Sequence, residues 1–232
     1  MGFFDVFKIN AALKMHQKGD LEGALKAYEE LYKAGCIRAF YLLPYSVLLL
    51  RKGGEENFLK VKEILRAAEK ASDLTPEKRQ QLQMNYAVAQ YALGELEKAV
   101  NLLEASHRKN PCGLIYQALG FLYIELGDPE KALAYNTEAL DYDDEDPVVL
   151  DNVGQMYYRM LNDKEKALEY FKKAHELKDS AIDTLYFLAK YDIENGDCAA
   201  AKEKLEKALG GNFSPLNYAT RDKVNELLAG LR

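Results

Sequence analysis

Small residues recur along the chain, and each is followed by larger ones at the spacing of a helical stripe. Six small residues are separated by steps of 33 to 38 residues: Ala24, Val61, Ala99, Ala132, Ala167 and Ala201. Four residues after them stand Tyr28, Leu65, Leu103, Asn136, Phe171 and Leu205. Seven residues after them stand Leu31, Ala68, Ser106, Ala139, Ala174 and Ala208. Positions four and seven apart share one face of an α-helix, so the pattern predicts six helices that each bury one stripe.

A turn signal comes five residues before the small residue in four places: Gly19-Asp20, Gly94-Glu95, Gly127-Asp128 and Gly196-Asp197. Looser turns at Gly53 and at Asn162-Asp163 fill the two gaps. Glycine permits the left-handed residue that ends a helix, and the acid that follows suits the start of the next helix. The chain is therefore predicted to form helical hairpins, of which residues 120–140 contain the clearest turn.

The repeat resembles that of the tetratricopeptide repeat family, whose unit is a helical hairpin of about 34 residues. The fourth copy carries the family residues Leu119, Gly120, Tyr123, Gly127, Ala132 and Ala139. The fifth carries Val153, Gly154, Tyr157, Ala167, Phe171 and Ala174, and the third carries Tyr86, Ala87, Gly94, Ala99 and Pro111. The chain departs from the family pattern at Asn136, where a large apolar residue is usual, and at Asp192, where Tyr is usual. It also lacks Trp, and its second copy has a longer turn.

The resemblance implies an all-α fold, a right-handed superhelical α-solenoid in one domain that spans residues 1–232. The expected repeats cover residues 5–38, 39–76, 80–112, 113–146, 147–180 and 181–211. Ser214 and Pro215 have the pattern of an N-cap and a first helical turn, which predicts a capping helix over residues 214–231. Such a helix would cover the apolar face that the last repeat leaves exposed.

Composition and charge limit the classes of partner. The chain has 31 Lys and Arg against 37 Asp and Glu, a net charge of −6, and nucleic acid binding rests on clustered positive charge. No nucleic acid partner is therefore expected. Three widely spaced cysteines, Cys36, Cys112 and Cys198, indicate a reducing compartment rather than a disulfide framework. The N-terminus has no signal-peptide pattern, and the apolar run of residues 40–50 is too short to span a membrane. We expect a cytoplasmic protein.

Catalytic and metal-binding motifs are missing from the sequence, so we expect no enzyme and no cofactor. The histidines, at positions 16, 107 and 175, lie in different repeats without the spacing of metal ligands. The acidic run of residues 141–146 fails as a calcium loop, because Asp146 and Asn152 stand where such a loop needs Gly and Glu. It is interpreted as a solvated loop, with contact to a cation or a basic peptide as the alternative. The apolar N-terminal residues, Phe3, Phe4, Val6 and Phe7, are expected to pack on the first repeat rather than on a membrane surface.

The resemblance also implies that the first helices of the hairpins line a concave groove and that their inward residues contact a partner. These residues are Leu43, Val47, Leu50, Met84, Asn85, Val88, Tyr91, Gln117, Phe121, Ile124, Asn152, Gln155, Tyr158, Arg159, Tyr186, Phe187 and Lys190. The alternative is that they pack against neighbouring helices. The two-carboxylate clamp of the family's chaperone-binding branch is disfavoured, because Ala12 follows Lys8 where that clamp needs Asn.

These features together favour a non-enzymatic scaffold that holds a peptide or helix of a partner protein in its groove. The alternative is a structural protein that self-associates through the apolar region of residues 40–50 or through its Phe-rich N-terminus.

Overall fold

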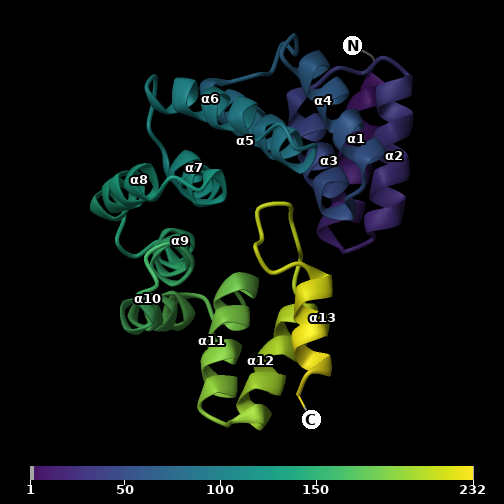
Figure 1. Ribbon diagram of the computed structural model, residues 1–232. Helices are drawn as coiled ribbons and strands as arrows, with labels where there is room; N and C mark the ends of the chain where they lie inside the picture. Colours follow the sequence, from purple (N-terminus) through teal and green to yellow (C-terminus); the bar gives the residue numbers. More distant parts are fainter. Residues whose placement is uncertain (1–2, 232) are drawn as a thin grey trace. The chain divides into compact units, whose positions relative to one another are not determined.

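A computed structural model describes residues 3–231, and for residues 3–5 only the backbone. Over that range the chain forms thirteen α-helices and no β-strand (Figure 1). The helices belong to two compact units, which meet in the sequence between Ser106 and His107. The expected all-α solenoid of helical hairpins is confirmed within each unit.

The first unit consists of three hairpins. Its helices are α1 (Phe3–Gln17), α2 (Leu21–Lys33), α3 (Ala39–Lys52), α4 (Glu55–Ala68), α5 (Pro76–Ala92) and α6 (Leu96–His107). The α1/α2 and α3/α4 pairs pack together, and α3 also packs on α2 and α5. A hydrogen bond from Ser106 Oγ to Gln83 Oε1, 2.7 Å long, joins α6 to α5. The first helices α3 and α5 therefore lie side by side, as the repeat pattern predicts.

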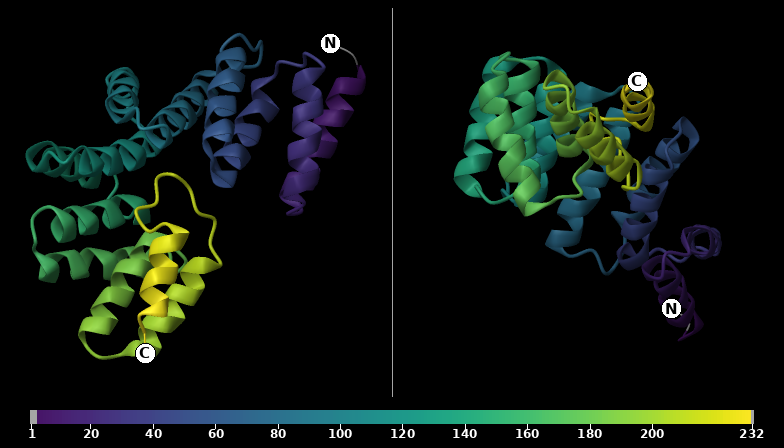
Figure 2. Two further views of the ribbon diagram at one scale, coloured as in Figure 1. Left: turned by 45° about the vertical axis from the view of Figure 1, so that its right-hand side comes forward. Right: turned by 90° about the horizontal axis from the view of Figure 1, so that it is seen from below.

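The second unit consists of three hairpins and one further helix. Its helices are α7 (Gly113–Leu126), α8 (Pro129–Tyr142), α9 (Pro147–Arg159), α10 (Lys164–Leu177), α11 (Ile182–Glu194), α12 (Cys198–Leu209) and α13 (Arg221–Ala229). Each second helix packs on the first helix of its own hairpin, and α9 also packs on α7. The last helix, α13, packs on α12. The two views of Figure 2 show α13, in yellow, beside the helices of this unit that precede it in the chain.

The acid after the turn glycine caps the helix that follows it. Asp128 accepts a hydrogen bond of 3.1 Å from the backbone N–H of Lys131, and Asp20, Asp163 and Asp197 make the equivalent bond at their own turns. Gly127 has a φ of 77°, in the left-handed region that favours glycine. In the fifth repeat Asn162 takes this place with a φ of 53°, which explains why that turn has no glycine.

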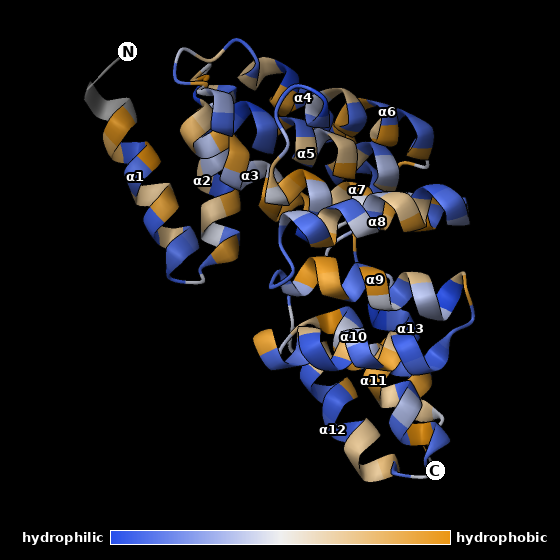
Figure 3. Cartoon of the chain, turned by 90° about the vertical axis from the view of Figure 1, so that its left-hand side faces the viewer, coloured by the Kyte–Doolittle hydropathy of each residue, from blue (hydrophilic) through white to orange (hydrophobic). Residues whose placement is uncertain are grey.

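The predicted stripes form the cores of the hairpins. All six small residues and all six residues four positions later have an exposed fraction of 0%. Figure 3 shows the resulting hydrophobic and hydrophilic stripes along the helices. Asn136 belongs to this set because its side-chain amide donates to the carbonyls of Gly120 and Ala132, at 3.3 and 2.9 Å. A Cβ atom on Gly120 would lie 2.5 Å from Asn136 Oδ1, so the glycine makes room for the amide.

The capping helix begins seven residues later than predicted, at Arg221 rather than at Ser214. The Asp183 carboxylate of α11 accepts hydrogen bonds from the backbone N–H groups of Tyr218 and Ala219, at 3.2 and 2.8 Å. A helix that began at Ser214 would use these N–H groups internally, so the two arrangements exclude each other. Thr220 caps the observed helix instead, and Val224 is fully buried in the core of the second unit.

Candidate functional site

The structure buries ten of the seventeen residues predicted to line the groove. They are Leu43, Leu50, Asn85, Val88, Phe121, Ile124, Asn152, Gln155, Tyr186 and Phe187. The other seven are partly exposed: Val47, Met84, Tyr91, Gln117, Tyr158, Arg159 and Lys190. The alternative interpretation, packing between helices, therefore describes the ten buried residues in this structure.

The buried amides among them connect neighbouring first helices. In the first unit Asn85 Nδ2 of α5 donates to Ser46 Oγ of α3 at 2.8 Å. In the second unit Asn152 Nδ2 of α9 donates to the carbonyl of Gln117 in α7, also at 2.8 Å. An amide that makes such a bond in a buried position stabilises the repeat junction and is not available to a ligand.

A chain of polar contacts runs across the first helices of the second unit. Asp151 accepts hydrogen bonds from Thr184 Oγ1 at 2.5 Å and from Gln155 Nε2 at 2.7 Å. Gln155 Oε1 accepts one from Arg159 at 3.0 Å, and Arg159 also forms a salt bridge of 2.6 Å with Glu125 of α7. Burial raises the pKa of Asp151, and the nearby Asp183 carboxylate raises it further. The carboxyls of both aspartates are covered by protein, which favours a role in positioning α9 and α11.

Rings and cations gather on the faces of α9 and α11. We call Tyr158, Arg159, Tyr186, Phe187 and Lys190 the aromatic–cationic surface. The Tyr158 ring centroid lies 5.1 Å from that of Phe187, and the Lys190 ammonium lies 4.8 Å from the centroid of Tyr158. The same ammonium lies 5.9 Å from the centroids of Tyr186 and Phe187. All five residues were predicted from the sequence, and the structure brings them together.

The first unit contains a cleft on the opposite side of α3 from the predicted groove residues of that helix. Its volume is about 640 Å³, and α2, α3 and α4 line it. Tyr45 and Leu49 supply its α3 wall, two residues away from Leu43 and Val47 and hence on another helical face. Leu25 and Leu59 add apolar surface, and three lysines and three glutamates contribute to the lining: Lys26, Lys52, Lys60, Glu29, Glu56 and Glu63.

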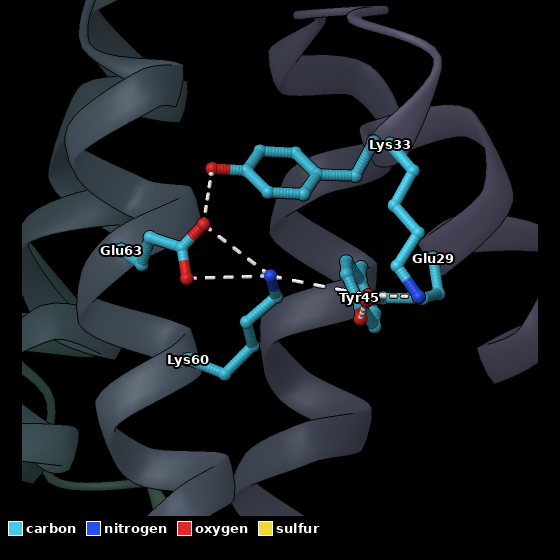
Figure 4. A network of polar contacts seen from close by, with 6 residues as sticks. Glu29, Lys33, Tyr45, Lys60 and Glu63 are labelled. Carbon is cyan, nitrogen blue, oxygen red and sulfur yellow. Dashed lines mark hydrogen bonds and ion pairs between the residues drawn. The ribbon is translucent and has the colours of Figure 1, made fainter.

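Several of the charged groups at this cleft are paired with one another (Figure 4). Lys60 bridges Glu29 and Glu63, with N–O distances of 3.9 and 3.3 Å. The Tyr45 hydroxyl donates to Glu29, and the Tyr32 hydroxyl donates to Glu63 at 2.9 Å. With three lysines against three glutamates, the lining has no excess of either charge.

Glu29 and Tyr32 at this cleft have pKa values that are shifted away from neutral pH. Burial raises the pKa of Glu29, but hydrogen bonds from Tyr45 and Lys33 and the charge of Lys60 outweigh it, so the net shift is downward. Burial and the bond to Glu63 raise the pKa of Tyr32 to about 12. Fixed charges of this kind orient a ligand but offer no proton transfer near neutral pH.

Residues 143–146 of the acidic run form a loop, as predicted, whereas Asp141 and Tyr142 are the last two residues of α8. Helix α8 ends at Tyr142 and α9 begins at Pro147, and residues 141–145 are exposed. Asp146 caps α9 by accepting the N–H groups of Val148 and Val149, and it accepts a further bond of 2.6 Å from Gln117 Nε2. Within residues 3–231 no group of three His, Cys, Asp or Glu side chains is placed to hold a metal ion.

The expected packing of the N-terminal apolar residues is wrong for the two whose side chains are described. Phe7 is 59% exposed and Val6 is 42% exposed, because Ile9 and Ala12 supply the buried face of α1 instead. The side chains of Phe3 and Phe4 lie outside the described part of the chain. Over that part no helix is both long enough and apolar enough to cross a membrane.

Sequence reasoning missed Asp183 of the first helix α11 and the functional residues that lie outside the first helices. The latter are Tyr218 of the loop before α13 and the α2 and α4 residues of the cleft. The alternation of Lys and Glu along α4 could have indicated a charged face, but such a face is common on exposed helices. Nothing in the residues around Tyr218 indicates that it returns to α11, more than thirty residues earlier.

An array of two-helix hairpins with small residues at each crossing defines a helical-repeat protein, and comparison with known proteins gives the family of two of these hairpins. Residues 114–146 and 149–180 match the tetratricopeptide repeat family. These two segments correspond to the α7/α8 and α9/α10 hairpins. These two hairpins are tetratricopeptide repeats. No curated protein matches its sequence.

Solved structures with the same fold cover most of the chain. MamA is 22% identical with a TM-score of 0.56, over 78% of this chain and 94% of its own. TTC0263, a thermophilic tetratricopeptide repeat protein of Thermus thermophilus, is 19% identical with a TM-score of 0.58, over 84% and 98%. PilW, a widely conserved type IV pilus biogenesis factor, is 16% identical with a TM-score of 0.63, over 98% and 100%. At these identities the likeness shows the fold. Stacked repeats of this class present extended surfaces that bind protein partners.

Proposed function

We propose that this chain is a non-enzymatic scaffold that binds a segment of a partner protein on the first helices of its second unit. The observation that carries the proposal is the aromatic–cationic surface on α9 and α11. The hairpin crossings use the small residues and the large residues of the second helices, so the repeat itself does not require Tyr158, Arg159 or Lys190. These three side chains are partly exposed.

The chemistry of this surface favours a peptide with apolar or aromatic anchors and acidic flanks. Aromatic residues and Arg are the residue types that contribute most at protein interfaces. The Lys190 ammonium lies over three rings, at 4.8 to 5.9 Å from their centroids, so its position is set before a partner arrives. An ordered cation loses less conformational entropy when a carboxylate binds to it.

The experiment is capture of partners from the native cell with the full chain and with Lys190→Glu. The charge reversal replaces the central cation of the surface, and we expect recovery of the specific partner to fall by about tenfold or more. Lys172→Glu is the matched control, because Lys172 is exposed on α10 and makes the same change of charge elsewhere. Equal recovery with both variants would reject α9 and α11 as the binding site.

Self-association is the second candidate, and the exposure of Val6 and Phe7 on α1 favours it through the N-terminus. Most of the apolar run of residues 40–50 is buried in α3, so that run supplies core rather than surface. Phe40 is the most exposed residue of this run, with an exposed fraction of 52%. Light scattering of the full chain over a concentration series decides between monomer and oligomer, and a monomer at every concentration removes this candidate.

A further inference from the structure

The loop between α12 and α13 covers part of the aromatic–cationic surface. This loop spans residues 210–220, between the end of α12 at Leu209 and the start of α13 at Arg221, and it is the yellow segment that precedes α13 in Figures 1 and 2. Phe187, at the centre of the surface, has an exposed fraction of 0%. Tyr218 of the loop is one of the residues that cover it.

The Tyr218 ring is held on several sides by residues of this surface and by α13. It stacks on Phe187 with a centroid distance of 5.4 Å and an angle of 20° between the planes. It makes a T-shaped contact with the Tyr186 ring, with a centroid distance of 6.2 Å. The Arg159 guanidinium lies 3.9 Å from the Tyr218 centroid, and the Lys223 ammonium of α13 lies 3.5 Å from it. A ring stacked on another ring and flanked by two cations is an arrangement that selects an aromatic side chain.

The backbone next to Tyr218 is bent, and it follows a turn in which the N–H of Asn217 donates to the carbonyl of Ser214 at 3.0 Å. The Asp183 carboxylate accepts the consecutive N–H groups of Tyr218 and Ala219, at 3.2 and 2.8 Å. It also accepts a bond of 3.2 Å from the side-chain amide of Asn217. Backbone N–H groups are present in almost any sequence, so the carboxylate supplies affinity for a chain segment and the ring pocket supplies selectivity.

The capping helix α13 has anchors of its own besides its contacts with the loop. Arg221 donates to the carbonyls of Leu209 and Gly211, at 2.9 and 3.3 Å, and so ties together the two ends of the loop. Val224 anchors α13 in the core of the unit. Two side chains of α13 also hold the loop: the Arg221 guanidinium lies 4.5 Å from the Phe213 ring centroid, and Lys223 donates to the Tyr218 carbonyl at 3.0 Å. Detachment of the loop would break these two contacts and expose Phe187 and the Asp183 carboxylate, whereas the bonds of Arg221 to Leu209 and Gly211 and the burial of Val224 do not depend on Phe213 or Tyr218.

We propose that this part of α9 and α11 is a docking site for a turn-forming, tyrosine-bearing segment of a partner protein, and that residues 213–219 are its built-in occupant. A partner has to displace this segment, so the loop competes with the partner for Phe187, Arg159 and Asp183. The proposal rests on the proposed function only in placing the partner on the second unit. The kind of segment it selects follows from the contacts of the loop itself.

The test uses a synthetic peptide with the sequence of residues 213–221, FSPLNYATR, and two forms of the full chain. One form is the unaltered protein. In the other, residues 213–218 are replaced by alternating Gly and Ser, which empties the site and keeps Thr220 and α13. Amide shifts in two-dimensional NMR spectra report binding at α9 and α11, and the signals of α13 report whether the altered chain is still folded. A peptide with Tyr218→Ala is the matched control.

We expect saturable shifts of α9 and α11 amides in the emptied chain, with a dissociation constant of about 0.1 mM or below, because the loop occupies the site only if its local concentration, on the order of 1 mM, exceeds this constant about tenfold. In the unaltered chain the peptide should bind at least about tenfold more weakly, since the loop occupies the site. The control peptide should cause no localised shifts in either chain.

The proposal is overturned by the absence of localised shifts, by equal shifts with both peptides, or by equal affinity for both chains. If the Gly and Ser replacement disturbs α13, the single variant Tyr218→Gly removes only the ring, and the same three outcomes apply to it. The experiment contains no natural partner, so its failure is separate from failure of the capture experiment with Lys190→Glu.

Discussion

Replacement of Gly154 by Ala tests how tightly the fifth repeat is packed. A Cβ atom at this position would lie 2.7, 2.8 and 3.0 Å from three carbons of the Phe171 ring. Ordinary contact between carbons is about 3.5 Å or more, so the ring would have to retreat by about 0.8 Å. Phe171 has an exposed fraction of 0%, and Phe187 stacks on it at 4.8 Å with an angle of 8° between the planes, which blocks the retreat.

The expected net effect of Gly154→Ala is destabilisation. Overpacking of a filled core costs about 1–3 kcal/mol, and the better helix propensity of Ala returns at most about 1 kcal/mol. The free energy of unfolding should therefore fall by about 1–2 kcal/mol. Gly113→Ala is the matched control, because Gly113 is also helical but a Cβ atom added there would meet no other atom within 4 Å.

Urea denaturation followed by circular dichroism measures both variants. Gly113→Ala should leave the midpoint unchanged or raise it, and Gly154→Ala should lower it. The reasoning fails if Gly154→Ala is as stable as Gly113→Ala, because the ring of Phe171 would then have room to move.

Two further predictions concern carboxylates. Burial raises the pKa of Asp151 to about 7, so between about pH 4 and pH 7 the folded chain keeps a proton that the unfolded chain releases, and its stability falls as the pH rises. In the Asp151→Asn variant, the decrease in the free energy of unfolding from pH 5 to pH 7.5, measured by urea titrations, should be smaller by about 2 kcal/mol or less. An unchanged decrease would contradict the raised pKa of Asp151. Asp73 accepts the N–H groups of Ala39 and Phe40 at the start of α3, at 2.9 and 3.0 Å. Asp73→Ala should lower the free energy of unfolding by about 1–2 kcal/mol, whereas Asp144→Ala in an exposed loop should not, and equal losses would refute the role of Asp73.

The hairpins could be predicted from the sequence because their signals are local. Ala24 and Tyr28 lie one helical turn apart, and both are fully buried. The turn acids cap helices by accepting hydrogen bonds from N–H groups only three residues away, so the position of each cap can be predicted from the spacing of residues in the sequence. The fold class, the turns and the buried stripes follow from this.

The binding surface could be predicted only in part, because contacts over long sequence distances decide which first-helix residues stay exposed. Gln155 has the position of a groove residue, but Asp151 and Arg159 engage its side chain. Asp183 looks like an ordinary first-turn acid, yet it binds the backbone of Tyr218 and thereby delays the start of α13. In the first unit the cleft lies on the other face of α3, a face that the family resemblance does not associate with ligands.

The hydrogen bonds between successive first helices of the second unit are different at each junction. The fourth and fifth repeats are joined by an amide on a backbone carbonyl, from Asn152 to Gln117, and the fifth and sixth by a hydroxyl on a carboxylate, from Thr184 to Asp151. A buried polar group that loses its partner carries a desolvation penalty. Although the hairpins share one plan, they are not interchangeable modules: excision of the fifth would leave Thr184 and the Gln117 carbonyl without their counterparts. The hydrogen bonds at the junctions therefore depend on the order of the repeats. Duplicating or moving a single hairpin would require new hydrogen-bond partners at both of its junctions.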